Sequence, residues 1–333
     1  MGFIEGLIKY ILMISPFLLL GLLVAGVIHV YLNVDKLKGF INNGKTSDIF
    51  KAAFFGIPLP LCSCAVIPSA VTLRKSGVKN GPTSSFLIST PETGVDSILV
   101  TYGLMDLPMT IIRPLAAFVS ASVAGIFQNI FNDKEFSDSE VKKSCCKKSK
   151  SNKKKNFLSI FRFGFVDLLD DISNWLAVGI IIGACIDYFI PANLFLEYNG
   201  LIAKILILGV GIPMYVCASA TTPIAAALMV KGLSPGAALI FLLVGPATNI
   251  SNILVLQKYI GKRGILINIL SISVVTLVFS FLVDYLYLAY ELPLNYKISG
   301  HHHGFSFLEY VASVSFVVLL IRSLVYNNII SKK

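Results

Sequence analysis

The chain contains one stretch of sequence twice, at a fixed offset of 155 residues. Residues 56–98 align with residues 211–253 without a gap, and 15 of the 43 paired positions are identical. The first copy begins GIPLPLCSCAVIPSAVTL and the second begins GIPMYVCASATTPIAAAL. Shared apolar composition would not readily align the matching prolines, glycines and cysteine, so we interpret the two stretches as copies of one unit.

Long apolar stretches indicate that this unit folds in a membrane. Only 14% of the residues are charged, 55% are apolar, and the mean hydropathy is +0.78. A soluble domain carries about a quarter charged residues, so a cytosolic enzyme is excluded as the default. The sequence predicts an all-α polytopic membrane protein with about 8–9 transmembrane helices, built from two internal repeats with broken helices. The candidate spans lie near 7–31, 49–73, 83–104, 107–131, 172–190, 200–230, 236–257, 264–290 and 305–326.

A basic central loop divides the chain. Residues 132–156 contain nine of the 28 lysines and arginines, beside four acids. Such a loop is typical of a cytoplasmic segment lying against anionic membrane lipid, which fits the net charge of +10 better than nucleic-acid binding does. We therefore expect a first membrane half over 1–131, a second half over 157–290, and a His-bearing loop with a C-terminal span over 291–333.

The positive-inside rule gives an orientation with one conflict. If every span crosses fully, the basic loop 74–79 and the N-terminus lie inside together with the loop 132–156. The basic residues of the loop 258–263 then fall outside. Either a segment is re-entrant or the count is off by one. The even number of spans between the copies favours a parallel repeat, whereas a re-entrant segment would make the repeat inverted. No organellar targeting segment is evident, which favours a prokaryotic inner membrane.

Each copy carries prolines in segments that would otherwise be membrane helices. Proline removes a backbone donor and clashes with the preceding turn, so these helices should be interrupted. Paired broken helices in a duplicated membrane unit are typical of secondary transporters, because broken backbone must line a cavity or protein. The alternative is that the prolines only kink helices for packing. The predicted breaks contain Pro58, Pro60, Pro91, Pro213 and Pro246.

Three cysteines lie at these breaks. Cys62 and Cys64 belong to the first break, and Cys217 occupies the matching point of the second. Thiolates are soft ligands that select Cu(I), Zn(II) or similar ions, and three of them would also suit a pyramidal trivalent metalloid. The alternative interpretation is that each free cysteine is a small buried hydrophobic residue.

Polar residues accompany both breaks. Glu92 follows Pro91 directly, and Asp96 lies one helical turn later on the same face. Carboxylates at membrane depth usually mark ion or proton paths, so Glu92 is a candidate proton-coupling group or hard ligand, while Asp96 could instead be solvated near an interface. Asn249 and Asn252 supply neutral polar groups at the second break and complete the predicted pore lining.

Two further clusters suggest metal capture outside the membrane. Cys145 and Cys146 lie in the central loop, and His301, His302 and His303 lie in the last extramembrane connection. Adjacent cysteines and short histidine tracts are compositional signs of metal handling. Residues 39–46 match a phosphate-binding loop pattern but lack the strand and the soluble domain that such a loop needs. We therefore expect neither an ATP site nor another cofactor.

The break motifs resemble a known family. GIPLPLCSCAVIP, STPETGVDS and VGPATNISN are similar to motifs of the predicted-permease family that contains the trivalent organoarsenical efflux permeases. The central cysteine pair and the histidine run resemble features of its copper/zinc efflux branch. The resemblance implies export of a soft metal or metalloid from the cytoplasm.

Three functions remain open at this stage. The first is a permease, not an enzyme, that exports a soft metal or metalloid by alternating access around a midplane site of Cys62, Cys64 and Cys217. The second is a transmembrane thiol–disulfide oxidoreductase that uses the same cysteines. The third is an accessory subunit of a larger transporter. The sequence also leaves a homo-oligomer open.

Overall fold

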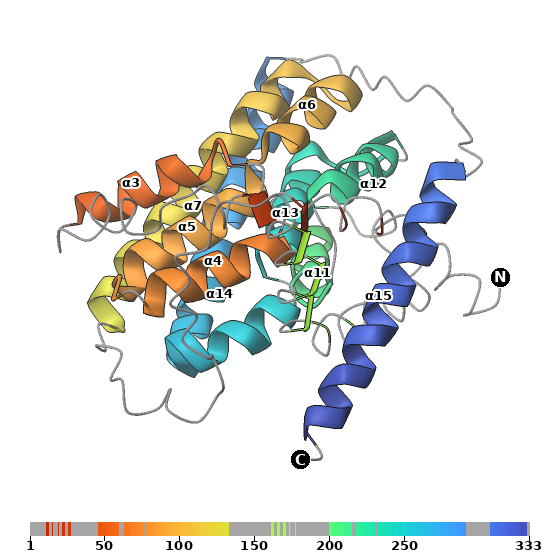
Figure 1. The fold of residues 1–333 in the computed structure, drawn as a ribbon. Helices are drawn as coiled ribbons and strands as arrows, with labels where there is room; N and C mark the ends of the chain where they lie inside the picture. The colour runs from red at the N-terminus through yellow and green to blue at the C-terminus, as the bar shows by residue number, and fades with distance from the viewer. Residues whose placement is uncertain are drawn as a thin grey trace.

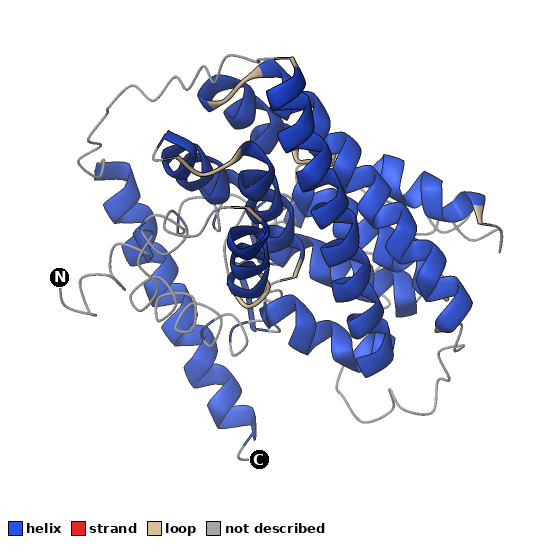
Figure 2. Ribbon diagram, turned by 180° about the vertical axis from the view of Figure 1, so that it is seen from behind, coloured by secondary structure: helices blue, strands red, loops and turns tan. Residues whose placement is uncertain are grey.

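The computed structural model describes residues 46–59, 63–75, 77–132, 200–214, 218–230, 232–248, 250–290 and 307–331, with scattered positions between 11 and 27 and between 161 and 177. Every regular element in these residues is a helix, which confirms the all-helical prediction for this part of the chain (Figure 1, Figure 2). The first set is α3 (Ser47–Gly56), α4 (Ser63–Lys75), α5 (Asn80–Glu92), α6 (Val95–Leu104) and α7 (Leu107–Phe131). The second is α11 (Leu201–Gly211), α12 (Ala218–Val230), α13 (Pro235–Ala247) and α14 (Ile250–Ala289), followed by α15 (Phe307–Ser331).

Helix boundaries recur at the 155-residue offset. Adding 155 to the bounds of α4 and α5 gives the bounds of α12 and α13, and α6 and α14 begin at matching positions. Gly77 and Gly232 stand at the same place in the two connecting turns, with φ of 90° and 109°. Glycine takes such left-handed backbone at no steric cost, which explains why both turns contain it. Gly261 (φ 82°) interrupts α14. At the 155-residue offset it corresponds to Asp106, the residue directly before α7 in the first set.

Helices α3 and α4 lie beside α5 in opposite directions. Ser85 Oγ donates to the Ile49 carbonyl at 3.0 Å, and Gly56 lies against the side chain of Thr90, so α3 runs with α5. A four-residue turn joins α4 to α5, so α4 runs back against it. The prediction of one continuous span over 49–73 is therefore wrong, because the chain reverses after α3 and forms a hairpin of two short helices.

The second set has the same hairpin arrangement. Lys204, near the start of α11, pairs with Asp284 at 2.7 Å, and Asp284 also accepts a hydrogen bond from the Gly236 N–H near the start of α13. Gly211, at the end of α11, lies against Val244 near the end of α13. Helix α11 thus runs in the direction of α13, as α3 runs with α5.

Helices α5 and α6 together extend along the whole of α7. The Gly81 N–H donates to Asn129 Oδ1 at 3.2 Å near one end, and Arg113 Nη1 donates to Thr101 Oγ1 at 2.7 Å near the other. Because α7 has 25 residues, the α5–α6 pair traverses the same depth with an interruption at residues 93–94. The pair forms one interrupted rod beside α7, and its crossing of the membrane stays a prediction.

Two helices among the described residues are long and apolar enough to cross a membrane, namely Leu107–Phe131 and Tyr259–Ala289. Both expose large apolar side chains at every fourth position, as a lipid-facing helix does and a soluble core helix does not. The stripe contains Leu107, Ile111, Leu115 and Val119 on α7, and Leu266, Leu270, Val274, Val278 and Leu282 on α14. The remainder of the predicted count of about 8–9 crossings stays a prediction.

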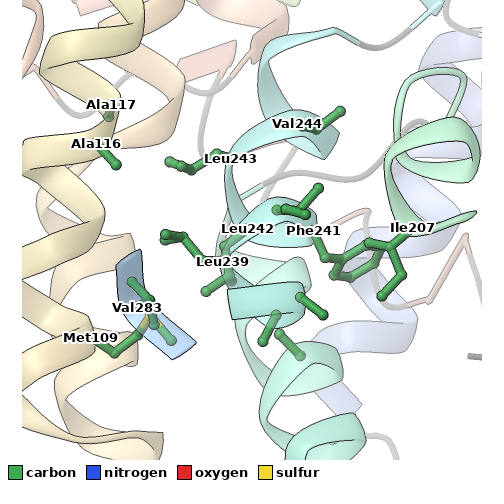
Figure 3. Close-up of a cluster of buried hydrophobic side chains, with 14 of the residues drawn as sticks. Met109, Ala116, Ala117, Ile207, Leu239, Phe241, Leu242, Leu243, Val244 and Val283 are labelled. Atoms are coloured by element: carbon green, nitrogen blue, oxygen red, sulfur yellow. The ribbon is translucent and has the colours of Figure 1, made fainter. Parts of the chain in front are cut away.

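The core of the molecule is built around the two short central helices. Every residue of α5 is buried, as is every residue of α13 after Pro235. Figure 3 shows Leu239, Leu242 and Leu243 of α13 facing α7, where Ala116 and Ala117 leave room for them. Small residues on α7 thus let the helices approach closely, as they do in membrane bundles.

Candidate functional site

The two central helices end in the same way. Pro91 and Pro246 stand in their last turns, and the next residues after the helices, Thr93 and Thr248, have nearly equal dihedrals (φ −121°, ψ 17° and φ −120°, ψ 20°). Each threonine hydroxyl donates to the carbonyl four residues earlier, at 2.6 and 2.8 Å. The side chains thereby satisfy carbonyls at the point where each helix is interrupted.

Glu92 is the last residue of α5 and is fully buried. Neither of its carboxyl oxygens has a hydrogen-bond partner among the described residues. A buried polar group without a partner is costly, and an ionisable one within a membrane segment is a functional candidate by default. Packing of the helix does not explain this residue.

Arg113 is the residue that the sequence analysis missed. It lies on α7 with 1% of its surface exposed, and its charge acts electrostatically on Glu92. Its Nη1 donates to Thr101 of α6 at 2.7 Å and to Thr222 of α12 at 3.0 Å, so it connects the two helix sets. The signal that could have found it is a lone cation within an apolar span.

The second set has no charges at the equivalent positions. Ala247 corresponds to Glu92, and Asn268 corresponds to Arg113. A cavity lies there instead, lined by Thr248, Asn252, Asn268 and by apolar side chains of α5 and α14. The two breaks therefore share their backbone geometry but differ in charge, since the first has Glu92, Asp96 and Arg113 where the second has uncharged residues.

The other predicted site residues are only partly placed. Pro58 and Pro213 lie in the turns that follow α3 and α11, and Asn252 is buried at the start of α14. Cys64 and Asp96 belong to α4 and α6, but their side chains are outside the described ones. Also outside the described residues are Pro60, Cys62, Cys145, Cys146, Cys217, Asn249, His301, His302 and His303. The thiol site stays a prediction, and the described part of the chain shows no cluster of three metal-binding side chains.

Known proteins provide an independent comparison. The family model described as predicted permease matches residues 2–285. A Streptococcus mutans protein named as a two-component membrane permease complex subunit is 25% identical over 276 residues, covering 80% of this chain and 90% of its own. UPF0718 proteins of Methanocaldococcus jannaschii and Bacillus subtilis are 24% and 21% identical, covering 74% and 80% of this chain and 84% and 92% of their own. No solved structure matches.

Proposed function

The chain belongs to the predicted permease family, and from that premise we propose that it exports a soft metal or metalloid from the cytoplasm. Membership supports a membrane transporter. The finer proposal concerns the substrate, which we take to be Cu(I), Zn(II) or a trivalent arsenical, held near the bilayer midplane by Cys62, Cys64 and Cys217. Soft ions favour thiolate ligands, and the three cysteines belong to the breaks of the two copies.

One observation carries the proposal of a transport site at the breaks. Glu92 is fully buried at the interruption between α5 and α6, and its oxygens have no hydrogen-bond partner among the described residues. Transporters use broken helices with an ionisable group at this depth to bind and release substrate or protons. We propose that Glu92 exchanges a proton during the transport cycle.

The matching helix boundaries support a two-repeat architecture for this transporter. In our proposal, the set α3–α7 and the set α11–α14 move against each other and expose the site alternately to the two sides. The hydrogen bond from Arg113 to Thr222 lies at their junction. The bonds of Gln128 to Asn268 and of Tyr287 to Asp106 also join the two sets, so the proposed motion has to rearrange these contacts as well.

The setting and the partners follow from the relatives. We propose a prokaryotic inner membrane, with lipid against the exposed apolar stripes of α7 and α14. The name of the streptococcal relative refers to a two-component complex. A partner subunit is therefore part of the proposal to be tested, and the first experiment compares membranes that contain only this chain with membranes from its native host.

The test is uptake into everted membrane vesicles. Cu(I), Zn(II) and methylated trivalent arsenic are offered to the native chain, to the triple variant C62S/C64S/C217S, and to a control variant. The control is C185S, which changes a cysteine of the apolar stretch 172–190 outside both repeated stretches. We expect one substrate to accumulate in vesicles that contain the native chain or the control variant. The same substrate should not accumulate in vesicles that contain the triple variant.

Two results would contradict the proposal. Full transport by the triple variant would show that the three cysteines do not form the transport site. A native chain that accumulates none of the three substrates, either alone or in host membranes, would remove the soft-ion substrate class. A Cys62–Cys217 disulfide trapped in native membranes would then favour the oxidoreductase.

A further inference from the structure

We propose that the cavity at the second break is a binding site for one dehydrated alkali cation. The polar residues that line this cavity are Thr248, directly after α13, and Asn252 and Asn268 of α14. All three are buried. The inference goes beyond the proposed function, because it adds a hard monovalent ion to a unit whose proposed substrate is soft. It does not depend on which substrate the chain transports.

The size of the cavity limits the ligand to a single small species. Its volume is about 20 Å³. One water molecule needs at least about 10–15 Å³, so the cavity has room for one water molecule or one dehydrated ion of similar size. A polyatomic ligand such as a methylated arsenical is larger than this space. The cavity is therefore not a second site for such a substrate.

The hydrogen bonds of the lining residues indicate what they offer to a ligand. The Thr248 hydroxyl donates to the Val244 carbonyl at 2.8 Å. Asn268 Nδ2 donates to Ser84 Oγ at 3.3 Å, and Asn268 Oδ1 accepts from Gln128 Nε2 at 2.8 Å. A hydroxyl oxygen and an amide oxygen each have two lone pairs, so both residues can still coordinate a ligand through oxygen. Oxygen lone pairs favour a cation.

The absence of carboxylates and thiols around the cavity selects the class of cation. Glu92 and Asp96 of the first break correspond to Ala247 and Ser251 here, and none of the described residues that line the cavity is titratable. Divalent cations prefer carboxylates, and soft ions prefer thiolates. Neutral hydroxyl, amide and backbone oxygens at broken helices bind alkali cations in transporters. The lining therefore fits a monovalent hard ion.

The end of α13 is the part of the cavity wall where backbone ligands are expected. Ala247 and Thr248 line the cavity at this end. The last carbonyls of a helix lack partners within the helix, and such carbonyls coordinate sodium where membrane helices are interrupted. Side-chain oxygens of α14 and the helix end of α13 thus meet at one cavity.

The first copy has a fixed cation at the equivalent position. Asn268 and Leu256 line the cavity, and they correspond to Arg113 and Thr101. Arg113 Nη1 donates to Thr101 Oγ1 at 2.7 Å, so a guanidinium group lies between these two positions in the first copy. Asparagine is shorter than arginine, which explains why space remains in the second copy. The same region of the fold thus contains a built-in cation in one copy and room for a dissociable cation in the other.

The experiment measures thermal unfolding of the purified full-length chain in detergent at pH 8. Sodium chloride, potassium chloride and N-methylglucamine chloride are compared at equal ionic strength, because the organic cation is too large for the cavity. We expect sodium or potassium to raise the unfolding temperature with a saturable dependence on concentration. Equal unfolding temperatures in all three salts would overturn the proposal and leave a buried water as the occupant.

Asn252→Asp tests the site by a gain of binding, which misfolding cannot imitate. The substitution adds a carboxylate at the cavity, so the affinity for the alkali cation should rise about tenfold or more at pH 8. The rise is read from the salt concentration that gives half of the shift in unfolding temperature. An unchanged or lower affinity of N252D would contradict a cation site.

Two matched valine variants separate the cavity from the helix break. Thr248→Val and Thr93→Val each remove a hydroxyl that donates to the carbonyl four residues earlier, and only Thr248 lines the cavity. Both variants should therefore lose similar stability in N-methylglucamine chloride. T93V should keep the alkali-cation shift, and T248V should lose most of it. A full shift in T248V, or its loss in both variants, would overturn the proposal.

The outcome is distinguishable from failure of the proposed function. If vesicle uptake of soft ions fails while N252D binds sodium or potassium more tightly than the native chain, the cation site stands and the soft-ion substrate falls. If uptake depends on the cysteines but no alkali cation stabilises the native chain, the thiol site stands and the cation site falls.

Discussion

Thr222 of α12 accepts a hydrogen bond of 3.0 Å from Nη1 of Arg113 on α7, and Thr101 of α6 accepts one of 2.7 Å from the same nitrogen. One buried cation thus holds an element from each helix set at the level of the first break. The two bonds are close to equal in length but differ in what they join, since only the bond to Thr222 spans the two sets.

Replacing Thr222 by valine removes one of the hydrogen bonds between the sets, the one from Arg113, and keeps the volume of the side chain. Bonds to a charged donor contribute about 1.5–3 kcal/mol, so we expect a loss of this size in the free energy of unfolding. Thermal unfolding in detergent measures it. The matched variant Thr101→Val should lose a similar amount but leave the motion of the sets unchanged. Faster transport by T222V than by T101V would identify the junction, and equal rates would contradict this role.

The ion pair of Lys204 and Asp284 can be exchanged for the residues of the other copy. Lys204 is 3% exposed and Asp284 is 28% exposed, and their counterparts are Ile49 and Asn129. Asp284→Asn keeps the bond to the Gly236 N–H, as Asn129 keeps that of Gly81, but leaves a buried ammonium without its carboxylate. We expect a loss of about 2 kcal/mol, between the values for surface and buried pairs.

The double variant K204I/D284N is the control for this exchange. It places the residues of the first copy at both positions. The double variant should therefore recover at least half of the free energy of unfolding that D284N alone loses. Chemical unfolding in detergent of the native chain, K204I, D284N and the double variant gives the four free energies of the double-mutant cycle. A double variant less stable than D284N would show that the two copies do not tolerate the same residues at this position.

Gly236 lies where a β-carbon would overlap the Ser280 carbonyl and the Asp284 side chain. Gly236→Ala should therefore destabilise the chain by about 1–3 kcal/mol through overpacking. Gly209 has nothing within 4 Å of such a carbon, so Gly209→Ala should stabilise α11 by about 0.5–1 kcal/mol. Opposite signs of the two shifts in unfolding temperature are the expected result, and a neutral G236A would contradict the close helix contact.

Val274 belongs to the exposed stripe of α14, near the middle of the span Tyr259–Ala289. A lysine there would meet lipid, which costs about 2.5–3.5 kcal/mol at the centre of a membrane helix. Val274→Lys should reduce the fraction of chain that resists alkaline extraction from membranes, while Val274→Leu should leave it unchanged. If V274K integrates as well as V274L, this face of α14 contacts protein or water instead of lipid.

The sequence identified the short helices at the breaks only in part. Proline and glycine at fixed spacing indicated where helices end, because those residues alter the backbone itself. The reversal between α3 and α4 was missed because α3, a turn and α4 together are as long and apolar as a continuous span. Hydropathy measures length and composition, and neither quantity distinguishes a hairpin from a crossing.

The candidate site shows the same limit. Glu92 was singled out because it follows Pro91, a local signal in the chain. Arg113 was missed because its importance comes from Thr101 and Thr222, the latter 109 residues away. Comparing the two copies position by position would have revealed that Glu92, Asp96 and Arg113 are all replaced by uncharged residues in the second copy. The cysteines remain untested, so the thiol site is a prediction from sequence alone.

The hairpins of α3–α4 and α11–α12 also change the sidedness of the protein. We expect each hairpin to leave the membrane on the side where it entered and so to add no crossing. Two predictions from the sequence are kept for segments outside the described residues, namely that the loop 132–156 is cytoplasmic and that the stretch 172–190 crosses once. The turn 76–79 then lies in the cytoplasm, and α11 starts outside. The crossing of α13 with the first part of α14 brings the loop 258–263 inside.

Every basic loop then obeys the positive-inside rule, and the conflict at 258–263 disappears. Three crossings separate equivalent points of the two copies, so we expect the copies to be antiparallel and the N-terminus to lie outside. Gly77 and Gly232, the same residue of the same turn, would then face opposite sides of the membrane. Each side of the membrane would thus be faced by one copy of this turn, contributed by one half of the chain.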